Sequence, residues 1–329
     1  MSSTDERQTR EQKLRGIHHV TAIAGDPQEN LDFYVGLLGL RLVKRTVNQD
    51  DPGTYHLFYG DALGHPGTEL TFFPWPGGSP GIPGVGQAAT VAFAVPESAL
   101  DYWIRRLRTR GMAIDGPVGR FDEEVIAFAD PHGLNLELVA GPDTGNRPLW
   151  SAWEGGPVPP DYAIRGVHGV AVKETRADPT GVFLTGTLGF RPAAEAEGRL
   201  RFQTDGGDSG ALLDLLPRPG ERRGRVAVGT VHHVAWRTPD APEQERWQEA
   251  IAARSVSVTP VIDRFWFRSI YFREPGGVLF EIATDGPGFM VDERSDELGS
   301  HLILPPWLEP QRPQIEAVLP PLRLPQFVR

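Results

Sequence analysis

Two pairs of adjacent histidines are the residues of this chain best suited to chemistry. His18 and His19 stand in GIHHVTAIAGD, and His232 and His233 stand in TVHHVAWRTPD. The second histidine of each pair lies seven residues before an aspartate, and the two pairs hold four of the nine histidines in the chain. A lone histidine on a strand is usually a packed side chain. Two histidines at equivalent positions of a repeat instead favour a metal site.

A carboxylate completes the candidate set of ligands. Glu281 stands in REPGGVLFEIATD, four residues after Gly277 of a turn. The chain has no cysteine, so a metal must be held by His, Asp or Glu, which favours Fe(II), Mn(II), Zn(II) or Ni(II). Two histidines and one carboxylate leave three positions of an octahedral ion open, which suits Fe(II) enzymes that bind a substrate and O₂ together. We therefore predict that His19, His233 and Glu281 bind one Fe(II), with Mn(II) as an alternative.

Four similar segments must position these residues. Each begins with a short β-rich run that ends in polar, turn-like residues, and each closes with a glycine-containing turn and a strand. Helix-like stretches follow three of the opening runs, for example at 27–40 and 97–111, where apolar residues recur at three- and four-residue steps. The pattern predicts an α+β fold of four βαβββ modules, paired into two domains with open mixed β-barrels.

The ligand set depends on which modules pair. If modules one and four pair, the inward slots of their first and last strands hold His19, Thr71, His233 and Glu281. If modules two and three pair, the slots hold Thr90, Glu137, Gly169 and Asp214, which is a poor site. Neighbouring side chains on a strand point to opposite faces, so His18 is expected to face away from the site unless its strand is bulged.

The composition limits the kinds of partner. The 329 residues carry a formal net charge of -10, which argues against binding to nucleic acid or to anionic lipid. The first residues lack the apolar core of a secretory signal, and no apolar stretch is long enough to span a membrane. We expect a cytoplasmic homo-oligomer that acts on a small molecule.

Changes in composition suggest the domain boundaries. We predict a disordered tail at 1–14, an N-terminal domain of modules one and two at 15–145, and a Gly- and Pro-rich linker at 146–162. A C-terminal domain of modules three and four follows at 163–285. The stretch 286–329 is rich in proline but contains Trp307 and several leucines, so we expect it to pack against the body.

The motifs together resemble a known family. The carriers are GIHHVTAIAGD, LGLRLVKRTVNQDD, TVHHVAWRTPD, DRFWFRSIYFREPGGVLFEIATDGPGF and LPPWLEPQR, which span nearly the whole chain. They resemble the vicinal-oxygen-chelate superfamily of glyoxalases and extradiol dioxygenases. More narrowly, they are similar to ring-cleaving dioxygenases that open hydroquinones, such as chlorohydroquinone dioxygenase.

The resemblance implies roles for particular residues. It implies that Fe(II) binds at His19, His233 and Glu281, and that a surrounding set of catalytic residues corresponds here to His18, Thr21, His232, Arg264 and Tyr271. Arg264 and Tyr271 have opposite parity on a strand, so Arg268 is an alternative for the arginine. Without the resemblance, Arg264 would be interpreted as a solvated side chain and Tyr271 as a half-buried strand residue.

The expected reaction is the opening of a para-diol aromatic ring with O₂. His232, Tyr271 or Arg264 could serve the hydroxyl that is remote from the metal, and Thr21 could orient O₂ or water. Phe265, Trp266 and Phe267 could wall a flat ring. Three alternatives stay open: a glyoxalase-type metal-dependent isomerase or lyase, a catechol extradiol dioxygenase, and a metal-free small-molecule-binding protein.

Overall fold

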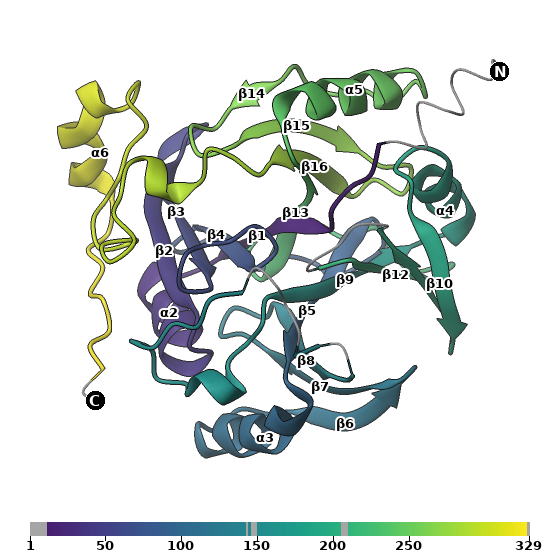
Figure 1. Cartoon of the computed structure of the whole chain (residues 1–329), viewed down its shortest axis with the longest axis horizontal. Helices are drawn as coiled ribbons and strands as arrows, with labels where there is room; N and C mark the ends of the chain where they lie inside the picture. The colour runs from purple at the N-terminus through teal and green to yellow at the C-terminus, as the bar shows by residue number, and fades with distance from the viewer. Residues whose placement is uncertain (1–11, 143, 146–149, 205–209, 328–329) are drawn as a thin grey trace.

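The computed structural model describes residues 12–142, 144–145, 150–204 and 210–327. Four consecutive units each contain one strand, one helix and three further strands (Figure 1). Unit one comprises β1 (Ile17–Ala24), α2 (Pro27–Leu31), β2 (Arg41–Asn48), β3 (Asp51–Gly60) and β4 (Glu69–Pro74). Unit two comprises β5 (Gln87–Val95), α3 (Leu100–Thr109), β6 (Asp115–Arg120), β7 (Glu123–Ala129) and β8 (Asn135–Ala140).

The second half of the chain repeats this order. Unit three comprises β9 (Val167–Glu174), α4 (Ala177–Gly186), β10 (Arg191–Ala196), β11 (Arg199–Gln203) and β12 (Leu212–Pro217). Unit four comprises β13 (Thr230–Thr238), α5 (Ala241–Ala252), β14 (Ile262–Asp263), β15 (Arg268–Arg273) and β16 (Leu279–Thr284). The predicted βαβββ modules are confirmed, and a helix follows the first strand in all four rather than in three.

The units pair across the chain rather than along it. One eight-stranded sheet has the order β14-β15-β16-β13-β1-β4-β3-β2, and the other has the order β10-β11-β12-β9-β5-β8-β7-β6. Unit one therefore shares a sheet with unit four, and unit two shares one with unit three. Each sheet takes one unit from each of the predicted domains 15–145 and 163–285. This is the pairing that the predicted ligand set requires.

Helix caps account for the constant distance from each predicted ligand histidine to an aspartate. The Asp26 carboxylate accepts hydrogen bonds from the amides of Gln28 and Glu29 at the start of α2. The Asp240 carboxylate does the same for the amide of Glu243 at the start of α5. Such caps satisfy amides that have no partner within the helix, so the aspartate marks the place where strand becomes helix.

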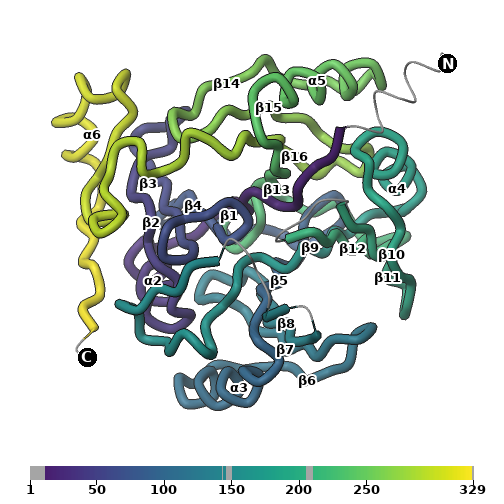
Figure 2. Tube along the Cα trace, in the orientation of Figure 1, coloured from purple at the N-terminus to yellow at the C-terminus, as the bar shows by residue number. Residues whose placement is uncertain are grey.

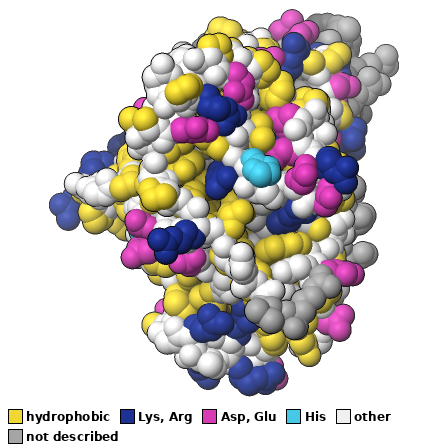
Figure 3. Space-filling model, turned by 90° about the vertical axis from the view of Figure 1, so that its left-hand side faces the viewer, with side chains coloured by type: hydrophobic (Ala, Val, Ile, Leu, Met, Phe, Trp, Pro, Cys, Tyr) yellow, Lys and Arg dark blue, Asp and Glu magenta, His cyan; other side chains and the backbone are white. Residues whose placement is uncertain are grey.

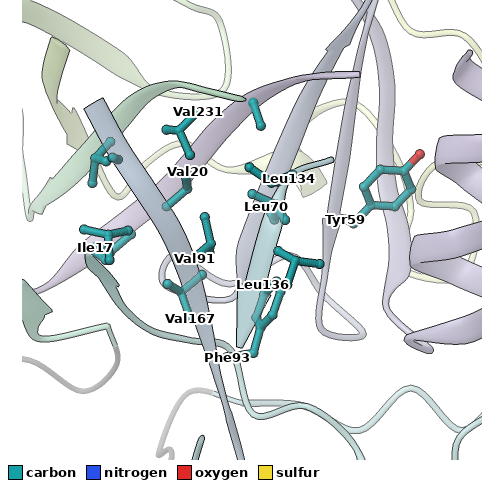
Figure 4. Close-up of a cluster of buried hydrophobic side chains, with 14 of the residues drawn as sticks. Ile17, Val20, Tyr59, Leu70, Val91, Phe93, Leu134, Leu136, Val167 and Val231 are labelled. Carbon is teal, nitrogen blue, oxygen red and sulfur yellow. The ribbon is translucent and has the colours of Figure 1, made fainter. Parts of the chain in front are cut away.

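The central strands of the two sheets pack against each other. Figure 4 shows side chains of β1 and β13, such as Val20 and Val231, near Val91 of β5 and Val167 of β9. Apolar residues alternate along β1 with His19 and Thr21, so the opposite face of this strand is available for a polar site. The shared core therefore fixes the strands that carry the candidate ligands.

The C-terminal stretch lies against unit one. It includes α6 (Arg312–Val318) and runs beside β2 and β3, where Arg45 forms a bridge with Leu302 (Figure 2). Leu304, Leu308 and Ile315 are buried in the main core. At the other end, residues 1–11 of the predicted tail lie outside the described residues, while Leu14 is buried. In the predicted linker, residues 146–149 lie outside them as well.

Two further observations concern the predictions that the protein binds neither nucleic acid nor a membrane. On the side of the molecule where α6 lies, acidic and basic side chains are interspersed (Figure 3). Among the described residues, no helix is long and apolar enough to cross a membrane.

Two buried carboxyl groups meet at the turn that precedes β16. Glu274 accepts hydrogen bonds from the amides of Gly276 and Val278 and from the Thr180 hydroxyl, at 2.6–2.8 Å. Burial and then the charge of Glu274 raise the pKa of Glu174 to about 8. Because the folded state holds a proton that the unfolded chain releases above pH 4.5, this pair lowers stability as the pH rises from 4.5 towards 8.

Replacing Glu174 with Gln should therefore change how stability depends on pH. At pH 8 we expect the free energy of unfolding of the variant to exceed that of the wild type by about 1–2 kcal/mol, after allowance for solvent screening. Its urea midpoint should be correspondingly higher. The difference should shrink towards pH 5, where the wild-type carboxyl is protonated in the folded state. Urea titrations at pH 5, 6.5 and 8 test this. A constant difference between the two proteins across this range would contradict it.

Candidate metal centre

The structure brings the three predicted ligands together inside the sheet of units one and four. His19 Nε2 lies 3.3 Å from His233 Nε2 and 3.4 Å from Glu281 Oε2, and His233 Nε2 lies 3.0 Å from the same oxygen. Their side chains are 1%, 6% and 0% exposed, respectively. Three ligand atoms thus face one another in a buried place.

Strand pairing produces this arrangement. β1 is antiparallel to β13, with Thr21 opposite His233 and His19 opposite Ala235. β13 is parallel to β16, with Ala235 beside Glu281. The three predicted ligands therefore come from three adjacent strands, which hold side chains more firmly than loops would.

The geometry and chemistry of these atoms fit a divalent metal. Two ligands bound about 2.1 Å from an ion and at right angles lie roughly 3.0 Å apart, close to the separations seen. Glu281 Oε1 accepts a hydrogen bond from Ser269 Oγ at 2.5 Å, which leaves Oε2 to face the two rings. Burial alone would raise the pKa of Glu281, but the rings of His19 and His233 hold it well below its ordinary value. This buried carboxylate is suited to a cation.

Each predicted ligand histidine contacts the histidine that precedes it. The Nδ1 atoms of His18 and His19 are 3.0 Å apart, and those of His232 and His233 are 2.8 Å apart. Burial lowers the pKa of His18 well below its ordinary value and that of His232 to about 3, so both rings are neutral, and Nδ1 of each can accept a hydrogen bond from Nδ1–H of the predicted ligand next to it. A proton on Nδ1 of the ligand leaves its Nε2 free for a metal. A bulge between Ile17 and His19 allows the first contact.

A hydrogen-bonded chain occupies the fourth inward slot. Thr71 Oγ1 lies 2.8 Å from Thr21 Oγ1 and 2.9 Å from His56 Nε2. The two threonines are buried and do not line the cavity beside the ligands, whereas His56 does. The His56 ring lies between Phe58 and Phe73, with centroids 3.9 and 4.4 Å away. Sequence reasoning missed His56, because it has no counterpart in the repeat.

Arg264 and Tyr271 lie together on another part of the cavity wall. Arg264 Nε donates to the Tyr271 hydroxyl at 3.3 Å, and its terminal nitrogens donate to Asp50 at 2.9 and 3.2 Å. Arg264 stands in the loop 264–267 between β14 and β15, so strand parity does not govern its direction. The alternative Arg268 is exposed and does not line the cavity. Burial and the charge of Glu281 raise the pKa of Tyr271, so its phenol keeps its proton.

One cavity of about 340 Å³ is lined by members of all three groups, namely His19, His233, His56, Arg264 and Tyr271, whereas Glu281 does not line it. Its volume is at the small end of the roughly 300–1,000 Å³ typical of ligand sites. Besides the polar residues above, its wall is mainly aromatic and includes Phe58, Phe73, Trp75, Trp266 and Phe267. Of the three aromatic residues predicted to wall a ring, Trp266 and Phe267 do so. Phe265 instead packs near Trp307 of the C-terminal stretch.

The equivalent slots of the other sheet are filled by ion pairs. Arg120 donates two hydrogen bonds to Glu137, at 2.6 and 2.8 Å, and Arg201 and Arg199 bind Asp214. A Cβ atom at Gly169 would lie 2.7 Å from the carbonyl oxygen of Leu212, so no larger side chain fits there. Only about 10 Å³ of space remains at this place. The guanidinium groups occupy the position that a metal could take in the first sheet.

Comparison with known families now places the chain. A family model described as "Glyoxalase/Bleomycin resistance protein/Dioxygenase superfamily" matches residues 16–138 and 177–282. The chain belongs to this superfamily. The predicted vicinal-oxygen-chelate fold, in which βαβββ units build open barrels around a site, is thereby confirmed.

Individual relatives narrow the class of enzyme. The chain is 46% identical to "Putative ring-cleaving dioxygenase MhqO" of Bacillus subtilis, over 95% of this chain and 98% of that protein. It is 32% identical to "Chlorohydroquinone/hydroquinone 1,2-dioxygenase" of Sphingobium indicum, over 91% of this chain and 94% of that protein. A crystal structure of a "putative dioxygenase" from Bacillus subtilis matches with a TM-score of 0.90 and 45% identity, over 96% of this chain and all of that one. The prediction of a ring-cleaving dioxygenase is confirmed at this level.

Proposed function

We propose that this superfamily member is an Fe(II)-dependent dioxygenase that opens hydroquinone-type rings with O₂. The observation that carries the proposal is the set of His19, His233 and Glu281, whose two histidines line a small aromatic cavity that also exposes the Tyr271 phenol. The 32% identical relative is named for the same class of substrate.

The ligand set suits Fe(II) and, as an alternative, Mn(II). Three protein ligands leave positions for a substrate oxygen and for O₂. When bound, such an ion lowers the pKa of a coordinated hydroxyl and brings the ring and O₂ together for electron transfer. The protein must do the rest by orienting the ring and moving protons.

A hydroquinone poses a particular problem for the protein. Its two hydroxyl groups stand on opposite sides of the ring, so only one can reach the metal and the other must be held by side chains. Tyr271, which is fixed by Arg264, can donate a hydrogen bond from its phenol to that second oxygen. Because Nδ1 of the neutral His232 ring accepts from His233, its Nε2 carries a proton and can donate a second hydrogen bond to this oxygen. Thr21 does not line the cavity, so we propose that it acts through Thr71, which holds His56.

The aromatic wall suits a single flat ring. Phe267 lies 5.3 Å from the His19 ring and 6.5 Å from Phe58, measured between ring centroids. These apolar surfaces exclude water from the ligands and favour a neutral aromatic substrate. The cavity volume leaves little room beyond one ring with small substituents.

Anaerobic reconstitution tests the proposal. Metal-free protein is loaded with Fe(II), the bound iron is counted by elemental analysis, and O₂ uptake is recorded with hydroquinone, catechol and a glyoxalase hemithioacetal in separate assays. We expect about one iron per chain and uptake of one O₂ per hydroquinone, together with an ultraviolet band of a ring-opened product. Faster O₂ uptake with catechol than with hydroquinone would favour a catechol extradiol dioxygenase instead. Isomerisation of the hemithioacetal without O₂ uptake would contradict the dioxygenase proposal and favour a glyoxalase-type isomerase.

A further inference from the structure

A buried lysine lies directly behind the wall of the cavity. Lys44 of β2 has no exposed side-chain surface, and its ammonium group donates to Asp292 at 2.7 Å and also to Glu293. The same nitrogen lies 5.2 Å from the ring centroid of Trp266 and 5.5 Å from that of Phe289. A buried charge is costly unless it is paired and hydrogen-bonded, so these contacts fix the C-terminal stretch to unit one.

Asp292 joins this ion pair to the cavity. Its Oδ1 accepts from Lys44, while its Oδ2 accepts from the indole Nε1 of Trp266 at 2.9 Å. A second tether runs from the amide of Gly288 to the carbonyl oxygen of Trp266, at 2.8 Å. One carboxylate from the C-terminal stretch therefore connects β2 of unit one with the loop 264–267 of unit four.

That loop supplies much of the active-site wall. Trp266 and Phe267 line the cavity, and the Phe267 ring packs 5.1 Å from His18 and 5.3 Å from His19. Phe265 has a φ of +72°, which is unfavourable for a bulky side chain. A loop with this strain keeps its conformation only where surrounding contacts hold it.

We propose that Asp292 is a positioning residue for substrate binding: by holding the Trp266 indole, it sets the aromatic wall against which the substrate ring lies. The C-terminal stretch is thus a part of the active site as well as a cover for unit one. Glu293 is the natural control, because it also pairs with Lys44, whereas the Trp266 indole donates its hydrogen bond to Asp292. Loss of either acid removes one negative charge from the same lysine.

A kinetic comparison of matched variants tests the proposal, and this part rests on the proposed substrate class. For Asp292→Asn we expect KM for hydroquinone to rise about tenfold, as for loss of a hydrogen bond to a charged group, with kcat changed less than about threefold. Glu293→Gln loses a buried ion-pair partner and so lowers stability, but it keeps the bond between Asp292 and Trp266 and should leave KM within about twofold of the wild type. Iron content should be the same in all proteins. Equal KM values in Asp292→Asn and the wild type, or equal increases in both variants, would overturn the proposal.

A double-mutant cycle separates positioning from general loosening of the fold. Trp266→Phe keeps an aromatic ring but loses the indole N–H, so it should raise KM as Asp292→Asn does. If Asp292 acts through Trp266, the double variant should be no worse than the poorer single variant by more than about twofold. Additive increases in KM would contradict the proposal.

The hydrogen bond of the Trp266 indole can also be tested by NMR, without any substrate. In protein labelled with ¹⁵N-tryptophan, the Trp266 indole resonance is identified by its loss in Trp266→Phe. We expect this resonance to shift upfield in Asp292→Asn and to stay in place in Glu293→Gln. An unmoved resonance in Asp292→Asn would overturn the proposal. Absence of turnover with hydroquinone in the wild type would instead count against the proposed function alone.

Discussion

Replacing Glu281 with Gln is expected to lower the affinity for Fe(II) by more than about 100-fold, because a lost ligand should cost more than the 10–100-fold typical of its hydrogen-bonded neighbours. The amide is nearly the same size as the carboxylate but carries no charge. The amide also has only one oxygen, so it cannot accept the hydrogen bond from Ser269 with one oxygen and bind a cation with another, as the carboxylate can. With hydroquinone as substrate, O₂ uptake should fall about 1,000-fold at limiting iron.

The second sheet offers a matched control for this variant. Glu137 stands in the equivalent slot but pairs with Arg120. Glu137→Gln should therefore keep the iron content and O₂ uptake of the wild type, while it lowers stability in urea. Isothermal titration of the metal-free proteins with Fe(II) under argon compares the two variants. An unchanged dissociation constant in Glu281→Gln would exclude Glu281 as a ligand.

Replacing Tyr271 with Phe is expected to reduce kcat about 100-fold, which is the lower end of the contribution of a well-placed proton donor or acceptor. Burial raises the pKa of this phenol, so the wild-type side chain remains a neutral donor throughout the working pH range. Arg264 holds the hydroxyl from one side. Phenylalanine preserves the packing against His233, whose ring centroid is 5.8 Å away, so iron binding should not change.

A buried tyrosine outside the cavity controls for the loss of a hydroxyl group. Tyr59 donates to Asn30 at 2.9 Å, and Tyr59→Phe should lower stability but leave kcat unchanged. Steady-state O₂ uptake and iron content of both variants decide the comparison. A kcat within about threefold of the wild type in Tyr271→Phe would show that the phenol takes no part in the chemistry.

That His19, His233 and Glu281 lie together could be predicted from the sequence because these residues follow the repeat. Capping aspartates keep His19 and His233 at a constant distance from the end of their strands, so that simple alignment of the units finds the two equivalent slots. Glu281 follows from its distance to a turn glycine. The structure brings these three side chains together, while their binding of Fe(II) stays a prediction.

Other features depend on local irregularities that no repeat encodes. Strand parity argued against Arg264, but a loop turns this side chain into the cavity. A bulge next to His19 lets His18 approach the ligand ring. His56 of β3 lines the cavity, and Asp292 of the C-terminal stretch contacts Trp266 of its wall. Neither residue has a counterpart in the other units. Contacts of this kind arise from tertiary packing and leave no pattern in the sequence.

The cross-chain pairing of units has a consequence for biosynthesis. Units two and three are complete once the chain has passed Pro217, so their sheet can close while unit four is still being made. Until β13 emerges, β1 has an unpaired edge, which is a hazard for aggregation in a nascent chain. The ligands of the candidate metal site come from the first and the last strands of the units. Loading with metal must therefore await nearly the whole polypeptide, and a prematurely terminated chain would retain His19 without the partners that make it a binding site.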